Sequence, residues 1–381
     1  MTTDKNPSTG RLSRRSVLKR TGVAVSALAF GSVPVKGRGP ETVQLPRYVS
    51  GGEPTEYFTA PKPWDEHRSV AKRVQSEVVS EYGGDEGVYG VGLTQSPETY
   101  GGKHGLGVEL LVGQSYDDSS VPSEISGIPV TTASGDPGIP GDCSVSDGTN
   151  NCVNKEGDTT INPAERVTGS EGAGTAAMKM TDSNSNEYLL TVSHLFRSNC
   201  PTDVNDESAY TADGDKVGTV SSSNSVDDWA VVELNSNGGT STTIDDNANF
   251  PSCVDAVSEA TLQDWGSQNK SNRPCLYQMG CTTGKTTGKL KYANFSETTF
   301  NTCVDYNSDG SADGVYTFCG FGQGDSGGPT WHMDGGDAHL VSTTALYHSL
   351  SGSICSGNDY GPDSSGMGAY AIENETDLSV P

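Results

Sequence analysis

Basic residues are scarce in this chain of 381 residues, which has 24 Lys and Arg against 49 Asp and Glu and a formal net charge of -25. This balance excludes a polybasic nucleic-acid binder. Long apolar runs are also missing, because the best candidate, residues 21–35, is short and only weakly apolar. A polytopic membrane protein is therefore excluded. Leu, Ile, Val and Phe number 19, 7, 33 and 8, and this low total in a highly charged chain is often a sign of disorder.

The apolar residues are nevertheless gathered into strand-length runs, such as 188–192 and 230–234. Val outnumbers Leu, and 48 Gly residues can supply turns, which favours short strands with tight connections. After residue 169 such strands alternate with polar turns, without the helices that parallel βαβ units need. We therefore expect an all-β domain over residues 169–381.

The first forty residues are typical of an export signal. Ser13-Arg14-Arg15-Ser16-Val17-Leu18-Lys19 is a twin-arginine signature, and a short apolar segment follows it at 23–30. No Cys follows that segment, so a lipoprotein anchor has no attachment point. We expect the twin-arginine machinery to export the folded protein to the extracellular side, without a stable membrane anchor.

Acidic residues dominate even more once residues 1–40 are removed. The rest of the chain then has 16 basic and 48 acidic residues, a formal charge of -32. Such an acidic surface is similar to that of proteins from salt-loving organisms, whose carboxylates stay hydrated while salt screens their repulsion.

A small N-terminal module is expected before the all-β domain. Residues 41–64 are rich in Pro and Gly and are expected to be a linker, after which Asp65 can cap a helix that ends at Gly83. Three short strands are expected next, at residues 88–93, 107–112 and 128–131. Residues 65–131 thus predict an α+β module, which is either a pro-segment that assists folding or blocks the active site, or a permanent structural part. Residues 132–168 are expected to be a loop-rich linker.

Nine cysteines are present, without the paired C-x-x-C spacings of a zinc site. At most four disulfides can form. Only polar turn residues lie between Cys143 and Cys152, which are expected to close a small loop.

The sharpest chemical signal is Gly324-Asp325-Ser326-Gly327-Gly328-Pro329. A serine nucleophile needs an exposed Oγ on a tight turn, and flanking glycines let backbone N–H groups converge on an oxyanion. The segment also satisfies the G-x-S-x-G pattern of α/β-hydrolase esterases, in which a histidine follows the serine. Three histidines do follow it: His332, His339 and His348. The surroundings argue against an esterase, because Gly-Gly-Pro is a poor helix start and crossover helices are missing.

A histidine and an aspartate also precede the serine. His194 follows the apolar run 188–192, where a loop at the end of a strand could hold its imidazole near Ser326. Asp228 opens the next strand and could orient His194 through the remote ring nitrogen, with Asp227 as the alternative. Each residue alone would be interpreted as structural, but the order His, Asp, Ser predicts a catalytic triad.

On these residues the sequence resembles the chymotrypsin-like serine peptidases, especially the streptogrisin-like prokaryotic branch. The resemblance runs from about Gly172 to Ile372. It is carried by Thr191-Val-Ser-His194, Asp228-Trp-Ala-Val-Val, Gly280-Cys-Thr-Thr-Gly284 and Gly324-Asp-Ser-Gly-Gly-Pro329. The resemblance implies two antiparallel six-stranded β-barrels with the active site in the cleft between them.

The resemblance also implies an endopeptidase that cleaves polypeptides through an acyl-enzyme. Ser326 would be the nucleophile, His194 the general base and then acid, and Asp228 the orienting carboxylate. The backbone N–H groups of Gly324 and Ser326 would form the oxyanion hole. A catalytically inactive relative that serves as a binding module is the alternative.

The substrate pocket follows from the same resemblance. Cys319 and Cys355 would pair across it, and Gly320, Tyr347 and His348 would line it. No acidic residue can be placed near Gly320, so a preference for Lys or Arg is not supported. His348 is expected to be either a surface histidine, which is the interpretation we favour, or a group that favours an acidic side chain, and the specificity stays open.

Oxygen-bearing side chains recur around Gly310, as in a calcium loop. They are Asp305, Asn307, Asp309 and Asp313. Tyr316 stands where an EF-hand has its bidentate Glu, so the alternatives are a structural calcium site of another kind and an Asp-rich hairpin turn. The expected hydrolysis itself requires no cofactor.

Overall fold

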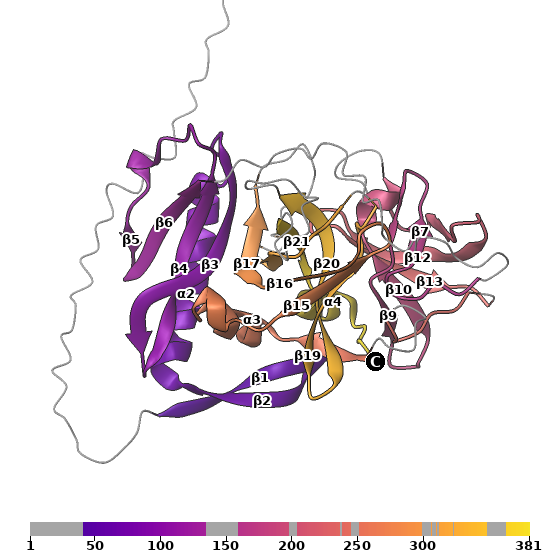
Figure 1. Ribbon diagram of the computed structural model, residues 1–381, viewed down its shortest axis with the longest axis horizontal. Helices are drawn as coiled ribbons and strands as arrows, with labels where there is room; N and C mark the ends of the chain where they lie inside the picture. The colour runs from indigo at the N-terminus through magenta and orange to yellow at the C-terminus, as the bar shows by residue number, and fades with distance from the viewer. Residues whose placement is uncertain are drawn as a thin grey trace, which may run out of the picture. The chain divides into compact units, whose positions relative to one another are not determined.

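The part of the chain that the structure describes is mostly β, with its strands in one seven-stranded and one fourteen-stranded sheet (Figure 1). The computed structural model describes residues 41–134, 159–197, 204–236, 238–244, 251–298, 306, 310, 312–322, 324–348 and 363–381, without the side chains of 347 and 348. The expected export signal and most of the second linker lie outside these residues. No helix in the described part of the chain is long and apolar enough to cross a membrane.

The chain described begins with a β-hairpin where a linker was expected. Strands β1 (Thr42–Ser50) and β2 (Glu53–Pro61) pair in antiparallel fashion around a turn at Gly51 and Gly52, which have φ values of 58° and 76°. The linker prediction for residues 41–64 is therefore wrong. The Pro and Gly content of this segment did not indicate a strand. Strand β1 is stabilised in part by pairing with β14 (Cys253–Val257), some two hundred residues away in the sequence, and local composition carries no sign of such a contact.

Helix α2 (Lys62–Tyr82) confirms the expected helix and begins four residues earlier, since its N-cap is Pro61 rather than Asp65. The earlier start is compatible with Pro63, because a proline in the first turn removes no helical hydrogen bond. The helix ends at Gly83, whose N–H donates to the Val79 carbonyl. Its buried residues recur every three or four positions, as in an amphipathic helix: Trp64, His67, Ala71, Val74, Gln75 and Val78.

The three strands expected after this helix are present and longer than expected. They are β3 (Val88–Tyr100), β4 (Lys103–Val112) and β6 (Ile128–Ser134). The connection from β4 to β6 contains η1 (Asp118–Ser120) and the short strand β5 (Glu124–Ile125). Strand β3 pairs with β17 (Leu290–Glu297) from the second half of the chain. The N-terminal strands thus continue the larger sheet.

The smaller sheet is antiparallel and comes from the first half of the expected peptidase region. Its order is β8-β7-β11-β12-β13-β10-β9. The strands are β7 (Arg166–Thr168), β8 (Ala173–Thr175), β9 (Met178–Thr181), β10 (Glu187–Thr191), β11 (Ser208–Tyr210), β12 (Lys216–Asn224) and β13 (Trp229–Leu234). A 3-10 segment, η2 (Ser193–Phe196), follows β10.

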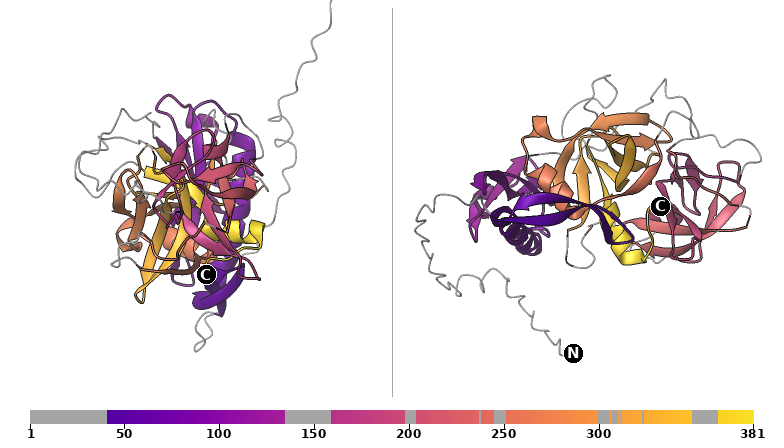
Figure 2. Two further views of the ribbon diagram at one scale, coloured as in Figure 1. Left: turned by 90° about the vertical axis from the view of Figure 1, so that its right-hand side faces the viewer. Right: turned by 90° about the horizontal axis from the view of Figure 1, so that it is seen from below.

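Within the described residues, the second half of the peptidase region contributes eight strands to the larger sheet. The seven and eight strands described in the two halves differ in number from the six expected in each. Besides β14 and β17, the strands of the second half are β15 (Leu276–Gly280), β16 (Gly284–Gly288), β18 (Gly314–Thr317), β19 (Pro329–Asp334), β20 (Asp337–His348) and β21 (Asp363–Gly368). The short helical elements are α3 (Glu259–Gly266), η3 (Lys270–Asn272) and α4 (Ala369–Thr376). Figure 2 shows β1 and β2 beside this sheet.

Tyr292 joins the N-terminal strands to β17. Its ring covers Gly92 of β3, where an added Cβ would lie only 2.5 Å from the Tyr292 Cβ. Its hydroxyl donates to the carboxylate of Glu109 in β4, the residue that pairs with Gly92. A glycine in β3 therefore leaves room for an aromatic ring that links three strands.

We predict that Gly92→Ala lowers the free energy of unfolding by about 1–3 kcal/mol, because the methyl group would overlap Tyr292 in a packed core. Gly84→Ala is the matched control, since a Cβ at Gly84 meets no atom within 4 Å. Denaturant unfolding at fixed salt measures both. Equal stability of the two variants would contradict the packing of β3 on β17.

Candidate active site

His194 lies at the end of strand β10, in the 3-10 segment η2. The strand before it is anchored by Leu189 and Leu190, which are fully buried. The chain then leaves the sheet, and the His194 side chain remains 34% exposed. The imidazole of His194 is therefore partly accessible to solvent, although the strand before it is buried.

Asp228 lies beside His194 because β10 and β13 are neighbours. Their register pairs Thr191 with Ala230, so the end of β10 meets the start of β13. Asp228 precedes β13 with φ 55°, a left-handed conformation that non-glycine residues rarely adopt. This turn directs its carboxylate back under η2, where the side chain has no exposure to solvent.

The Asp228 carboxylate is held by several donors from η2. Its Oδ2 lies 2.7 Å from Nδ1 of His194, and its Oδ1 accepts hydrogen bonds from the His194 backbone N–H at 2.9 Å and the Ser193 hydroxyl at 2.8 Å. Nη2 of Arg197 lies 3.4 Å from the same Oδ1. Burial alone would raise the pKa of this carboxyl, yet His194 and Arg197 hold it below its ordinary value.

Asp227, the alternative to Asp228, faces a different partner. Its Oδ2 accepts a hydrogen bond of 2.7 Å from the Asn224 side chain. The structure therefore places Asp228 rather than Asp227 against the imidazole of His194.

Ser326 lies in a tight turn with a glycine on either side. Gly324 and Gly327 have φ values of 96° and 95°, a conformation that favours glycine. Ser326 Oγ lies 3.5 Å from the Ala345 carbonyl, and the Ser326 carbonyl accepts a hydrogen bond of 2.7 Å from the Thr175 N–H. The turn is thus fixed to β8 of the smaller sheet and to β20 of the larger one.

Gly174 connects the serine turn to the histidine segment. A Cβ at Gly174 would lie 2.4 Å from the Ser326 carbonyl oxygen and 2.9 Å from the side chain of Leu195, the residue after His194. Both segments therefore pack against the same glycine of β8. The segment that carries His194 and the turn that carries Ser326 thus meet at this point of the fold.

Asp325 fixes the serine turn from beneath. Its Oδ1 accepts hydrogen bonds from the N–H groups of Thr282 and Thr283, at 2.8 and 3.0 Å. Its Oδ2 accepts from the Thr283 hydroxyl at 2.5 Å and the Gly322 N–H at 2.8 Å. Burial raises the pKa of Asp325, and the bonds from Thr283 and Gly322 oppose that rise. Gly280 leaves space for this carboxylate, because a Cβ there would lie 2.0 Å from Asp325 Cγ.

Sequence reasoning noted Gly280-Cys-Thr-Thr-Gly284 but assigned no role to its threonines. It also missed Ser193 and Arg197. An isolated Ser, Thr or Arg carries no spacing signal, and only the fold shows which carboxylate it faces.

We predict that Thr283→Val lowers the free energy of unfolding by about 1–3 kcal/mol, since it removes a donor from the buried Asp325 carboxylate. Thr283→Ser keeps the hydroxyl and is the matched control, with a loss of about 1 kcal/mol or less. Denaturant unfolding in molar salt compares them. A Val variant as stable as the Ser variant would show that the hydroxyl does not hold the turn.

The residues expected to line the substrate pocket are only partly described. Gly320 accepts a hydrogen bond of 2.8 Å from Thr286 through its carbonyl. The side chains of Tyr347 and His348 lie outside the described residues.

The cysteines differ from expectation at one position. Cys319 is a free, buried cysteine in the structure, which corrects the expected disulfide with Cys355. Burial raises the pKa of its thiol to about 12, and its Sγ lies 3.9 Å from the Leu276 carbonyl oxygen. Cys281, for which no partner was expected, is disulfide-bonded. The other expected half-cystines, Cys143, Cys152 and Cys355, lie outside the described residues.

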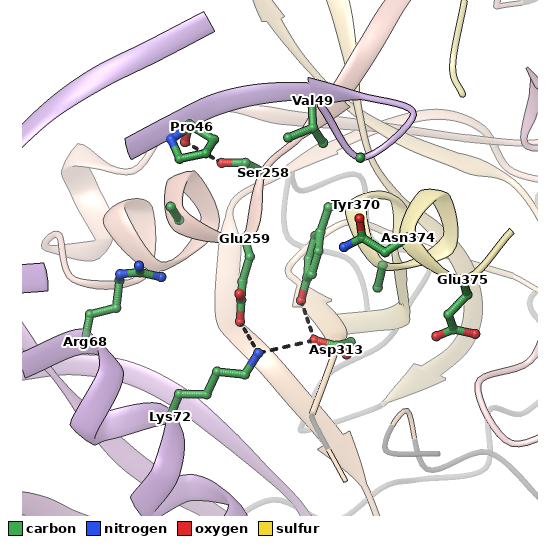
Figure 3. A pocket seen from close by; sticks show the side chains of 13 residues that line it. Pro46, Val49, Arg68, Lys72, Ser258, Glu259, Asp313, Tyr370, Asn374 and Glu375 are labelled. Carbon is green, nitrogen blue, oxygen red and sulfur yellow. Dashed lines mark hydrogen bonds and ion pairs between the residues drawn. The ribbon is translucent and has the colours of Figure 1, made fainter. Parts of the chain in front are cut away.

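Among the expected calcium ligands, Asp313 is described and faces protein groups. Its Oδ1 accepts a hydrogen bond of 2.9 Å from the Tyr370 hydroxyl and lies 3.9 Å from Lys72 Nζ. These groups line a cavity of about 370 Å³ between β1, α2, α3 and α4, in which Lys72 also pairs with Glu259 (Figure 3). Asp305, Asn307 and Asp309 lie outside the described residues. The cavity is lined by none of the residues around Ser326.

Comparison with known families identifies the region that contains the site. Residues 175–360 match the family model described as Trypsin. This segment is a trypsin-family serine peptidase domain. It includes His194, Asp228 and Ser326, and it has a mostly-β, chymotrypsin-like fold that the strands and helix of residues 41–134 precede.

A search of curated proteins finds no match to the chain. Among solved structures, the chain is similar to Thermobifida fusca protease A, a Nocardiopsis protease and Cellulomonas bogoriensis chymotrypsin. Each is 15% identical, with TM-scores of 0.42, 0.42 and 0.41, and the similarity covers 58% of this chain and 98% of each of those chains.

Proposed function

We propose that the protein is a secreted serine endopeptidase that hydrolyses peptide bonds through an acyl-enzyme on Ser326. The observation that carries the proposal is the double attachment of His194 to Asp228, through both its backbone N–H and its Nδ1. This attachment fixes the position and the tautomer of the imidazole together. A ring whose Nδ1 donates to a carboxylate presents Nε2 as a proton acceptor.

In the proposed reaction, the same groups act first in forming the acyl-enzyme and then in its hydrolysis. Nε2 of His194 accepts the proton of Ser326 as Oγ attacks the peptide carbonyl, and the resulting imidazolium is stabilised by Asp228. The N–H groups of Gly324 and Ser326 would donate to the oxyanion. His194 then protonates the leaving amine, and a water molecule hydrolyses the acyl-enzyme by the same route in reverse.

The α/β-hydrolase interpretation needs a histidine after the serine, and two of the three are engaged elsewhere. Nδ1 of His332 lies 3.2 Å from the Cys275 carbonyl, and His339 contacts Asp255. An antiparallel arrangement of β15, β19 and β20 surrounds the serine turn in place of the parallel sheet such an enzyme needs. The peptidase is therefore the function we propose, and an inactive binding module is the alternative that the next experiment tests.

We expect a fluorophosphonate to label the full-length protein at Ser326 and casein to be cleaved. Ser326→Ala should abolish labelling, and Asp228→Asn should reduce casein cleavage by about 10⁴-fold because it disturbs the tautomer of His194. Asp227→Asn is the matched control and should retain most activity. Peptide mass mapping locates the label. Folded protein that takes up no label would favour the inactive binding module.

The role of the N-terminal region is tested by the same label. We propose that residues 41–134 are a permanent structural part, because β3 pairs with β17 and β1 with β14. Labelling that begins only when the chain is cut before about residue 165 would instead identify an inhibitory pro-segment.

Export through the twin-arginine pathway and adaptation to salt are further proposals. The first is supported by Arg14-Arg15 and the second by the charge of -25.

We predict that the thermal midpoint rises with KCl, with most of the gain below about 1 M, where the Debye length has already fallen to about 3 Å. Differential scanning calorimetry at fixed pH measures this. A midpoint that does not depend on salt would contradict an acidic surface that needs screening.

A further inference from the structure

A second cation-bearing side chain belongs to the segment that carries His194. Arg197 follows η2 directly, and its side chain is only 4% exposed. One end of its guanidinium lies 3.4 Å from Oδ1 of Asp228. Arginine stays charged at every pH at which a protein is folded, so this is a fixed positive charge beside a buried carboxylate.

The negative charge of Asp228 needs a positive charge beside it, because the carboxylate is buried away from water. Burying a carboxylate costs several kcal/mol unless charges and dipoles compensate it. The Ser193 hydroxyl and the His194 N–H supply neutral dipoles. Among the described residues, His194 would be the nearest group able to supply a positive charge in the absence of Arg197, and it could do so only by taking up a proton.

A protonated His194 cannot accept the proton of Ser326. A carboxylate with no other counter-charge therefore lowers the fraction of active enzyme at mildly acidic pH, since it favours the imidazolium. A guanidinium on the same carboxylate acts in the opposite direction. It satisfies Asp228 while the imidazole is neutral.

We infer that Arg197 is a positioning residue of the site, whose buried charge compensates Asp228 and thereby keeps His194 neutral and able to act as a base at lower pH. This inference rests on the proposed peptidase function. Arg197 acts through Asp228 and touches neither the substrate nor the reacting atoms.

Two other titratable groups lie near Asp228 and Arg197, namely Asp227 and Tyr306. Asp227 is buried, and its carboxylate accepts from Asn224. The Tyr306 phenol is buried, and its pKa is raised well above its usual value, first by burial and then by charges that include Asp228 and Glu297. These neighbours are acidic or neutral, so they increase the need for a cation at Asp228.

The direct test follows the protonation of His194 by NMR with ¹³C-labelled histidine, in a Ser326→Ala background that needs no activity. Arg197→Met removes the charge and keeps much of the side-chain volume, whereas Arg197→Lys keeps the charge and is the matched control. At an effective dielectric constant of about 20, loss of a unit charge several ångströms away should raise the titration midpoint of His194 by about one to two pH units. The Lys variant should stay within about 0.3 unit of the parent.

A His194 midpoint that is unchanged in Arg197→Met would overturn the inference. If that variant does not fold, Arg197→Gln also removes the positive charge and places an uncharged amide in the buried site, where it can form hydrogen bonds. Thermal unfolding reports whether each variant is folded, and a purely structural role would lower stability without moving the midpoint.

The rate of fluorophosphonate labelling against pH gives the second reading, in protein with Ser326 intact. The acidic limb of the Met variant should move up by the same amount, so that labelling at about pH 6 falls several-fold while the plateau above about pH 8 changes less. If no variant is labelled, the proposed peptidase function fails, and the NMR titration still decides whether Arg197 controls His194.

Discussion

The burial of Asp228 is the constraint on which the site depends. A carboxylate without solvent exposure must be surrounded by donors, and this one takes them all from residues 193–197. The donors can converge only if the chain leaves β10 as a tight 3-10 turn and if Asp228 itself adopts a left-handed conformation before β13. The orientation of His194 is therefore a consequence of satisfying a buried charge.

A second buried carboxylate, Asp325, performs the corresponding task for the serine. It is satisfied by the β15–β16 hairpin, whereas Asp228 is satisfied within the smaller sheet. The Ser326 turn also contacts β8, through the hydrogen bond from Thr175. Each sheet thus contributes one polar anchor, and a shared contact at Gly174 brings the two together. Displacing either anchor would move the His194 segment relative to the Ser326 turn.

The contact of His194 with Asp228 and the tight turn at Ser326 were predictable from the sequence, because each residue lies in a motif with its own local signal, a strand end or a glycine-rich turn. Helix α2 and strands β3, β4 and β6 were also predictable, since their apolar periodicity is local. The hairpin of β1 and β2 was not, because its pairing with β14 is a long-range contact. The roles of Arg197 and Thr283 escaped for the same reason: their partners are 31 and 42 residues away.

The molecule holds a second histidine–aspartate pair, which shows why proximity alone does not make a site. His339 contacts Asp255, and its ring stacks on Tyr48 of β1 with centroids 3.7 Å apart. The His339 side chain is 8% exposed and lies between the N-terminal hairpin and the larger sheet. Its neighbours thus bury the ring on all sides, while the His194 side chain is 34% exposed. The same two residue types bury a ring against β1 in one place and leave it partly exposed in the other, and this difference in exposure is what separates the two pairs.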